Sequence, residues 1–220
     1  WEAVSEYIAK LGKTDLTPPR LIRNVLGVCK DLYLGKPGDD TTVSVMRLMI
    51  PQPVAIFSGP PKNKEDDARI VNDFMSAPGI HIVSGGTTSE VLARETGVSI
   101  EVDMDYCDSD LPPIASIKGI DLATEGVLTM RRVLEILDMY EKDPSSQEML
   151  DILDTKDGAS MLAKILIEKC TDLKLFIGRA INPSHRMSDF PMELRVKSHI
   201  LDDLAASMER LGRNVEKTYY

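Results

Sequence analysis

The stretch Ile80-His81-Ile82-Val83-Ser84-Gly85-Gly86-Thr87-Thr88-Ser89 joins a short apolar strand to a predicted helix through a glycine turn. The same order of strand, turn and helix starts at Val54 and recurs toward the end of the chain. This alternation predicts an α/β fold, a mostly parallel sheet flanked by helices in a Rossmann-like three-layer arrangement. Pro51-Gln52-Pro53 interrupts the pattern, so we expect one domain over residues 1–50 and an α/β domain over 54–220.

Apolar runs and helical periodicity locate the individual elements. The expected strands of the α/β domain cover residues 54–58, 80–83, 98–102, 117–122, 173–177 and 215–220, and its main helices cover 64–77, 89–95, 157–170 and 193–211, with a further helix opening at 124–126. Within residues 1–50 the apolar pattern predicts a helix over 1–12 and a second helix from Thr17 to Gly35 with prolines in its first turn. A strand is expected over 41–50.

The turn Gly85-Gly86-Thr87-Thr88 is the clearest local signal for a binding site. Paired glycines let backbone amides approach a ligand, and hydroxyls at a helix N-terminus add donors beside the positive end of the helix dipole, which suits a phosphate or carboxylate. The turn matches neither a Walker A motif nor a GxGxxG dinucleotide fingerprint. A tight turn in which Thr87 or Thr88 is an ordinary N-cap explains the same residues, so both interpretations stay open.

Three further turns follow predicted strands, at Gly59-Pro60-Pro61, at residues 121–126 and at residues 178–183. If these strands are parallel, their carboxyl ends meet at one edge of the sheet, where ligands of open α/β sheets bind. Arg179 would then offer a guanidinium to an anion. Asp121, Glu125 and Asn182 would add polar contacts, although a surface ion pair and a simple turn explain Arg179 and Asn182 individually.

Composition excludes several classes of function. The formal net charge of −9 argues against a nucleic-acid partner, since phosphate backbones are bound by clustered Lys and Arg. Three widely spaced cysteines offer neither a disulfide framework nor a CxxC motif and favour a cytoplasmic location. No apolar run approaches the length of a membrane span. No Ser/His/Asp or Cys/His nucleophile motif is present, so we assign no catalytic residue.

Two adjacent carboxylates stand at the entrance of the predicted strand over 41–50, in the run Gly38-Asp39-Asp40-Thr41-Thr42-Val43. Asp is a poor strand residue, so the pair is either turn-forming or a ligand of a hard cation. The run resembles the last metal-binding motif of the metal-dependent (PPM-type) serine/threonine phosphatases, in particular the bacterial stage II sporulation protein E family. The order of the four turns is likewise similar to that in the C-terminal extension of some members.

The resemblance implies a function for the longer protein. Asp39 would be a ligand of Mn²⁺ or Mg²⁺ in a two-metal site, with Asp40 as its neighbour, and the substrate would be a phosphoserine or phosphothreonine phosphoprotein. The other metal-ligand aspartates of that family have no counterpart in this sequence. We therefore expect a fragment that is inactive by itself, with the N-terminal half of the phosphatase domain as its partner.

Two other roles remain open for the α/β domain. It is a sensor that binds a phosphorylated or carboxylated small molecule at its glycine turns, or it is an assembly module. In the second case the helices of residues 1–34 pack against a second copy in a homodimer.

Overall fold

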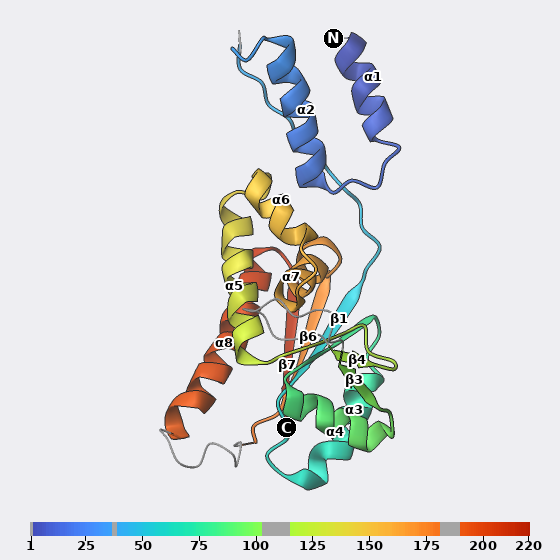
Figure 1. Cartoon of the computed structure of the whole chain (residues 1–220), viewed down its shortest axis with the longest axis vertical. Helices are drawn as coiled ribbons and strands as arrows, with labels where there is room; N and C mark the ends of the chain where they lie inside the picture. Colours follow the sequence, from blue (N-terminus) through green and yellow to red (C-terminus); the bar gives the residue numbers. More distant parts are fainter. Residues whose placement is uncertain (1, 37–38, 103–114, 181–189) are drawn as a thin grey trace. The chain divides into compact units, whose positions relative to one another are not determined.

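The computed structural model of the chain describes residues 2–36, 39–102, 115–180 and 190–220, with only the backbone at residues 190–198 (Figure 1). The chain divides into two compact units. The first unit comprises Trp1–Ile50 and Met139–Ile152, and the second comprises Pro51–Asp138 and Leu153–Tyr220. No described helix is both long and apolar enough to cross a membrane.

The second unit is built on a seven-stranded sheet with the strand order β3-β4-β5-β2-β1-β6-β7. The strands are β1 (Pro53–Ser58), β2 (Ile80–Ser84), β3 (Ile100–Val102), β4 (Ala115–Ile117), β5 (Leu122–Thr124), β6 (Asp172–Ile177) and β7 (Asn214–Tyr219). Strand β1 pairs in parallel with β2 and β6, β2 with β5, and β6 with β7, whereas β4 is antiparallel to both β3 and β5. The prediction of an α/β fold with a mostly parallel sheet is confirmed.

Helices cover both faces of this sheet (Figure 1). They are the 3₁₀ helix η1 (Lys64–Asp66) and the α-helices α3 (Asp67–Met75), α4 (Gly86–Thr96), α5 (Val127–Lys142), α7 (Gly158–Glu168) and α8 (Phe190–Arg210). Helix α6 (Gln147–Asp154) belongs mainly to the first unit. Alternation along β1 divides the faces: Phe57 is buried in a cluster with Phe74 of α3 and Leu92 of α4, whereas Ser58 lies beside residues of α5 and α8. Helices α3 and α4 therefore cover one face, and α5 and α8 cover the other.

Phe74 is the centre of the core on the α3/α4 face. Its ring centroid lies 5.6 Å from that of Phe57 on β1 and 5.7 Å from that of Phe176 on β6, the latter in an edge-to-face geometry. The ring of His81 meets Phe74 edge-on at 5.1 Å, and its Nε2 lies 3.1 Å from the Phe74 carbonyl oxygen. These aromatic contacts fix α3 across the central strands.

Two expected boundaries differ from the structure. The single strand expected over residues 117–122 is two strands, β4 and β5, separated by a turn in which Gly119 has φ +89° and Ile120 N donates to Ile117 O. A residue in the left-handed region cannot continue a strand, and the turn reverses the chain. Helix α4 begins at Gly86, three residues before the expected start, because Ser89 N already donates to Gly85 O.

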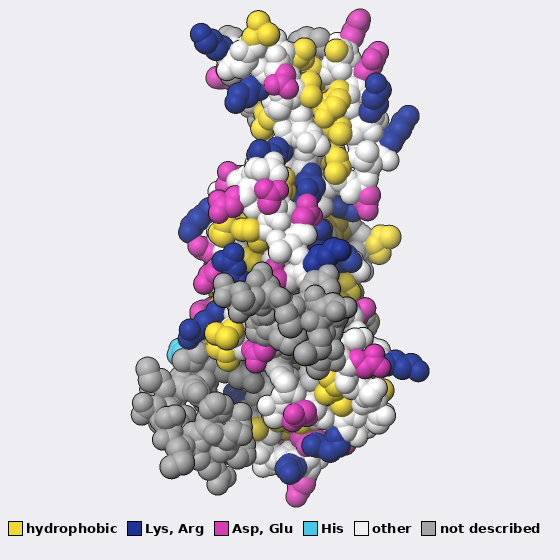
Figure 2. Space-filling model, viewed as in Figure 1, with side chains coloured by type: hydrophobic (Ala, Val, Ile, Leu, Met, Phe, Trp, Pro, Cys, Tyr) yellow, Lys and Arg dark blue, Asp and Glu magenta, His cyan; other side chains and the backbone are white. Residues whose placement is uncertain are grey.

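The first unit contains α1 (Glu2–Leu11) and α2 (Pro18–Leu32), in agreement with the two predicted helices. Helix α2 is tied to the segment around α6 by two arginines. Arg23 Nη1 donates to Ser145 O at 3.0 Å, and Arg20 Nη2 donates to Leu150 O at 3.3 Å. Figure 2 shows hydrophobic side chains at the surface of this part of the molecule. Leu32 and Leu34 are 60% and 92% exposed.

The strand predicted over residues 41–50 does not form in the structure. Met46, Leu48 and Ile50 are 90%, 93% and 89% exposed, so this half of the apolar pattern remains at the surface, whereas Val43 and Val45 are partly buried. A strand is stabilised by cross-strand hydrogen bonds and side-chain pairs, and neither is available here. The helix-helix-strand unit expected from the sequence therefore lacks its strand.

Candidate functional site

The carboxyl ends of four parallel strands define one edge of the sheet, which we call the carboxyl edge. Strands β1, β2, β5 and β6 end there at Ser58, Ser84, Thr124 and Ile177. The turns that follow them thus lie together, as the sequence predicted for parallel strands.

Asp121 is an exception to this prediction. Strand β5 begins only at Leu122, so Asp121 lies at the opposite edge, which we call the amino edge. Its Oδ2 accepts a hydrogen bond from His81 N at 2.8 Å, at the start of β2. The expectation that Asp121 contributes to a site at the carboxyl edge is therefore wrong, and its carboxylate instead joins the starts of two strands.

Two glycines are in contact where β2 and β5 end. Gly85 has φ +106°, and its N donates to Thr124 O at 2.9 Å. A Cβ added to Gly126 would lie 3.6 Å from the Gly85 Cα. Because α4 and α5 cover opposite faces, the chain turns to opposite sides after two neighbouring parallel strands. Such a topological switch point is where open α/β sheets bind ligands.

The start of α4 leaves its first amides uncapped by a side chain. Gly85 is the N-cap, and the first intrahelical hydrogen bond runs from Ser89 N to Gly85 O. Gly86 and Thr87 are exposed, and a Cβ on Gly86 would meet nothing within 4 Å. The backbone amides of Gly86 and Thr87 are therefore available to a ligand at the positive end of the helix dipole.

Thr88 is a structural member of the glycine turn. The residue is buried, and its Oγ1 donates to Ser84 O at 3.0 Å and accepts from Gly59 N at 2.9 Å. This hydroxyl links the turns after β1 and β2 and is not available to a ligand.

Glu125 is fixed by its backbone and exposes its carboxylate. Its carbonyl oxygen accepts from Thr124 Oγ1 at 3.0 Å and from Ser84 Oγ at 3.3 Å. The side chain is exposed and lies immediately before Gly126. It adds one negative charge near the start of α5.

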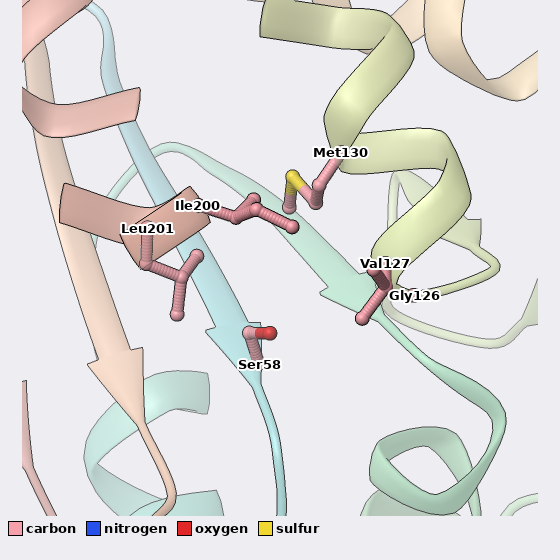
Figure 3. A pocket seen from close by; sticks show the side chains of 6 residues that line it. All are labelled: Ser58, Gly126, Val127, Met130, Ile200 and Leu201. Atoms are coloured by element: carbon pink, nitrogen blue, oxygen red, sulfur yellow. The ribbon is translucent and has the colours of Figure 1, made fainter. Parts of the chain in front are cut away.

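A small pocket opens on the α5/α8 side of the carboxyl edge (Figure 3). Its volume of about 10 Å³ is close to the room that one water molecule needs. The pocket, which we call the Ser58 pocket, is lined by Ser58, Gly126, Val127, Met130, Ile200 and Leu201. The hydroxyl of Ser58 points into it, as Figure 3 shows, from a residue that is only 3% exposed. This hydroxyl makes no hydrogen bond with any residue that the structure describes.

Sequence reasoning missed Ser58 as a site residue. The one available signal was a hydroxyl at the end of the apolar run Val54-Ala55-Ile56-Phe57, directly before Gly59. The apolar walls come from α5 and α8, so only the folded chain brings them to Ser58.

The turns after β1 and β6 are joined by backbone hydrogen bonds. Gly178 N donates to Ser58 O at 3.1 Å, and Ala180 N donates to Pro60 O at 2.9 Å. A Cβ on Gly178 would overlap the carbonyl oxygens of Gly59 and Pro60. These backbone contacts fill the gap between the two strand ends.

Arg179 stands at the rim of this closed turn. Its guanidinium lies 4.2 Å from the ring centroid of Tyr219, and its N donates to Tyr220 O at 3.0 Å. Tyr220 is anchored in turn, since its hydroxyl donates to Asp73 Oδ2 at 2.7 Å, and burial together with this bond raises the pKa of Tyr220 to about 12. Asn182 lies outside the described residues.

Asp39 and Asp40 are exposed and lie next to each other in the first unit. Asp40 N donates to Asp39 Oδ1 at 2.9 Å, a turn-type contact. Across the part of the chain that the structure describes, no group of three or more His, Cys, Asp or Glu side chains could hold a metal ion. Two carboxylates do not suffice for a pair of metal ions, so these residues do not fit a complete phosphatase metal site.

Comparison with protein-family models finds no match for the chain, and comparison with curated proteins finds none either. The carboxyl edge is therefore interpreted from its own chemistry.

Proposed function

We propose that the second unit is a regulatory α/β module that binds a small phosphorylated or carboxylated molecule at the carboxyl edge. In the same proposal the chain is the C-terminal part of a metal-dependent serine/threonine phosphatase, and the module regulates that enzyme. The observation that supports ligand binding is the contact between Gly85 and Gly126, which brings the starts of α4 and α5 together from opposite faces of the sheet.

The electrostatics of this arrangement favour an anion. Each helix start carries a partial positive charge of about half a unit, and its first amides have no intrahelical acceptor. Glycines at both starts keep side chains away from the amides, so a ligand can approach the backbone. Lys62 and Arg179, in the turns after β1 and β6, are exposed and add positive charge along the same edge.

A thermal-shift and calorimetric screen of the 220-residue chain tests ligand binding. The compounds are inorganic phosphate, glycerol 3-phosphate, nucleotides, acetate and citrate. A ligand present at 100 times its Kd stabilises the protein by about 2.7 kcal/mol. We expect a saturable shift with at least one of these anions and its loss in Gly86→Val, whose side chain would cover the start of α4.

Gly27→Val is the matched control for this variant. Gly27 is also an exposed helical glycine with nothing within 4 Å of an added Cβ, but it lies in α2. It should therefore change stability little, because Val has a higher helix propensity than Gly, and it should keep ligand affinity. A folded Gly86→Val protein with unchanged affinity for every anion would contradict the proposal.

The exposed carboxylates of Asp39 and Asp40 favour a second role, for the first unit, as part of the phosphatase domain. Because the described residues do not complete a metal site, we expect no Mn²⁺-dependent hydrolysis of a phosphoserine peptide by this chain. Asp39→Asn should leave this result and the melting temperature unchanged. Hydrolysis that requires Mn²⁺ and disappears in Asp39→Asn would show that the chain holds a working site.

A further inference from the structure

We infer that the ligand of the carboxyl edge is a phosphate monoester, one of whose terminal oxygens enters the Ser58 pocket and hydrogen-bonds the Ser58 hydroxyl. This inference rests on the proposed ligand-binding role and specifies its chemistry.

The first step is the state of Ser58. Its side chain is almost wholly buried, points into the pocket, and has no hydrogen-bond partner among the described residues (Figure 3). The hydroxyl oxygen keeps some exposed surface in the pocket, so an oxygen of a ligand can reach it and replace solvent as its hydrogen-bond partner. The volume of about 10 Å³ admits a group the size of one oxygen and no larger.

The second step is the start of α5, which forms another wall of the pocket through Gly126 and Val127. The first intrahelical hydrogen bond of α5 runs from Met130 N to Gly126 O, so the amides of Val127 and Leu128 precede it. An oxygen in the pocket therefore meets a hydroxyl and the positive end of a 16-residue helix. Met130, Ile200 and Leu201 form the apolar walls of the pocket, and beside apolar walls the attraction between a charged oxygen and these donors is stronger than in bulk water.

The third step distinguishes a phosphate from a carboxylate. The start of α4 lies on the other side of the Gly85–Gly126 contact, so two positive helix ends meet, and Lys62 stands in the turn that follows Ser58. Opposing them, Glu125 contributes one exposed negative charge. A phosphate monoester has about −1.5 to −2 charges at pH 7 and three terminal oxygens, enough to use the pocket and the second helix start together. A carboxylate has one charge and two oxygens in a plane.

Isothermal titration of the 220-residue chain with glycerol 3-phosphate, inorganic phosphate and acetate tests the inference. We expect glycerol 3-phosphate to bind, and Ser58→Ala to weaken it by about 10- to 100-fold, the loss typical of a hydrogen bond to a charged group. Ser58→Ala should fold normally, because the hydroxyl has no described partner to lose. The matched control is Ser160→Ala, since Ser160 is also 3% exposed but lies in α7; its affinity should not change.

Each alternative outcome has a separate meaning. Equal affinity of wild type and Ser58→Ala for glycerol 3-phosphate would overturn the inference and leave the proposed function intact. Tighter binding of acetate, or binding of inorganic phosphate alone, would overturn the assignment to a monoester. No binding of any of the three anions would overturn the inference, and if the wider screen were also silent the proposed function would fail with it.

Discussion

The two edges of the sheet in the second unit use their polar groups differently. At the amino edge, side chains are hydrogen-bonded within the protein: Asp121 accepts from His81 N, Thr171 Oγ1 accepts from Gln52 N at 2.7 Å, and Asn214 Nδ2 donates to Asp172 Oδ1 at 2.9 Å. At the carboxyl edge, the Ser58 hydroxyl and the first amides of α4 and α5 have no such partners among the described residues. Other hydroxyls of the carboxyl edge, those of Ser84, Thr88 and Thr124, are hydrogen-bonded within the protein, so the difference between the edges lies in Ser58 and the two helix starts, where we propose that the ligand binds.

The start of α7 shows a helix whose first amides are capped by a side chain of the protein itself. Asp157 Oδ1 accepts from Ala159 N and Ser160 N, both at 2.9 Å, as the sequence predicted for a helix start at this residue. The N-cap of α4 is Gly85, which has no side chain to do the same. The N-caps of α2 and α3, Thr17 and Asp66, also make no side-chain cap bond, so α4 differs from them in having a glycine at this position, which leaves its first amides open to the carboxyl edge.

The largest expected effect comes from the glycines that close the backbone at each edge. A Cβ on Gly178 would overlap the carbonyls of Gly59 and Pro60, and a Cβ on Gly79, which has φ +95°, would overlap the carbonyl of Pro53. We expect Gly178→Ala and Gly79→Ala each to destabilise the protein by about 3 kcal/mol or more, measured by urea unfolding. Gly27→Ala is the control and should stabilise by about 0.5–1 kcal/mol. A loss below about 1 kcal/mol in either variant would show that the two turns are not closed as described.

Substitution of one carboxylate at each edge should give smaller effects, on stability at the amino edge and on anion affinity at the carboxyl edge. Asp121→Ala removes the acceptor of His81 N and should cost about 1 kcal/mol of stability without changing anion affinity. Glu125→Ala should change stability by less than about 0.5 kcal/mol, because no side-chain hydrogen bond is lost, and should strengthen anion binding by removing a like charge. Urea unfolding and titration with glycerol 3-phosphate give both quantities. The reverse pattern, with stability lost at Glu125 and affinity changed at Asp121, would contradict the assignment of the edges.

Much of the sheet could be predicted because its central strands are buried on both faces. Strands β1, β2 and β6 are mainly apolar runs, interrupted by His81 in β2 and Lys174 in β6, and glycine follows each of them; their order with helices implied parallel pairing. Strands β4 and β5 have three residues each, too few for a periodic pattern, so the turn at Gly119 was missed. The segment over 41–50 has the pattern of a strand, but pattern alone does not supply a neighbour.

The candidate site could be predicted only in part. Glycine turns after parallel strands located the carboxyl edge, and Gly85 and Gly86 stand there. The sequence could not show that β5 starts after Asp121, or that the Thr88 hydroxyl already accepts a hydrogen bond from Gly59 N. Nor could it show that residues of α5 and α8 line the pocket at Ser58. These facts depend on register and on contacts between residues that are distant along the chain.

The position of β1 in the middle of the sheet has a consequence for how the protein is made. Its first neighbour in the sheet, β2, follows soon after it in the sequence, whereas its second neighbour, β6, is synthesised much later. The hydrogen bond from Gln52 N to Thr171 Oγ1, beside these two strands, joins residues that are 119 positions apart. A growing chain on the ribosome therefore carries its most apolar strand with one edge unpaired until most of the module has been synthesised. Such distant pairing slows folding and exposes the nascent chain to aggregation, so translation speed and chaperone supply are expected to determine its yield.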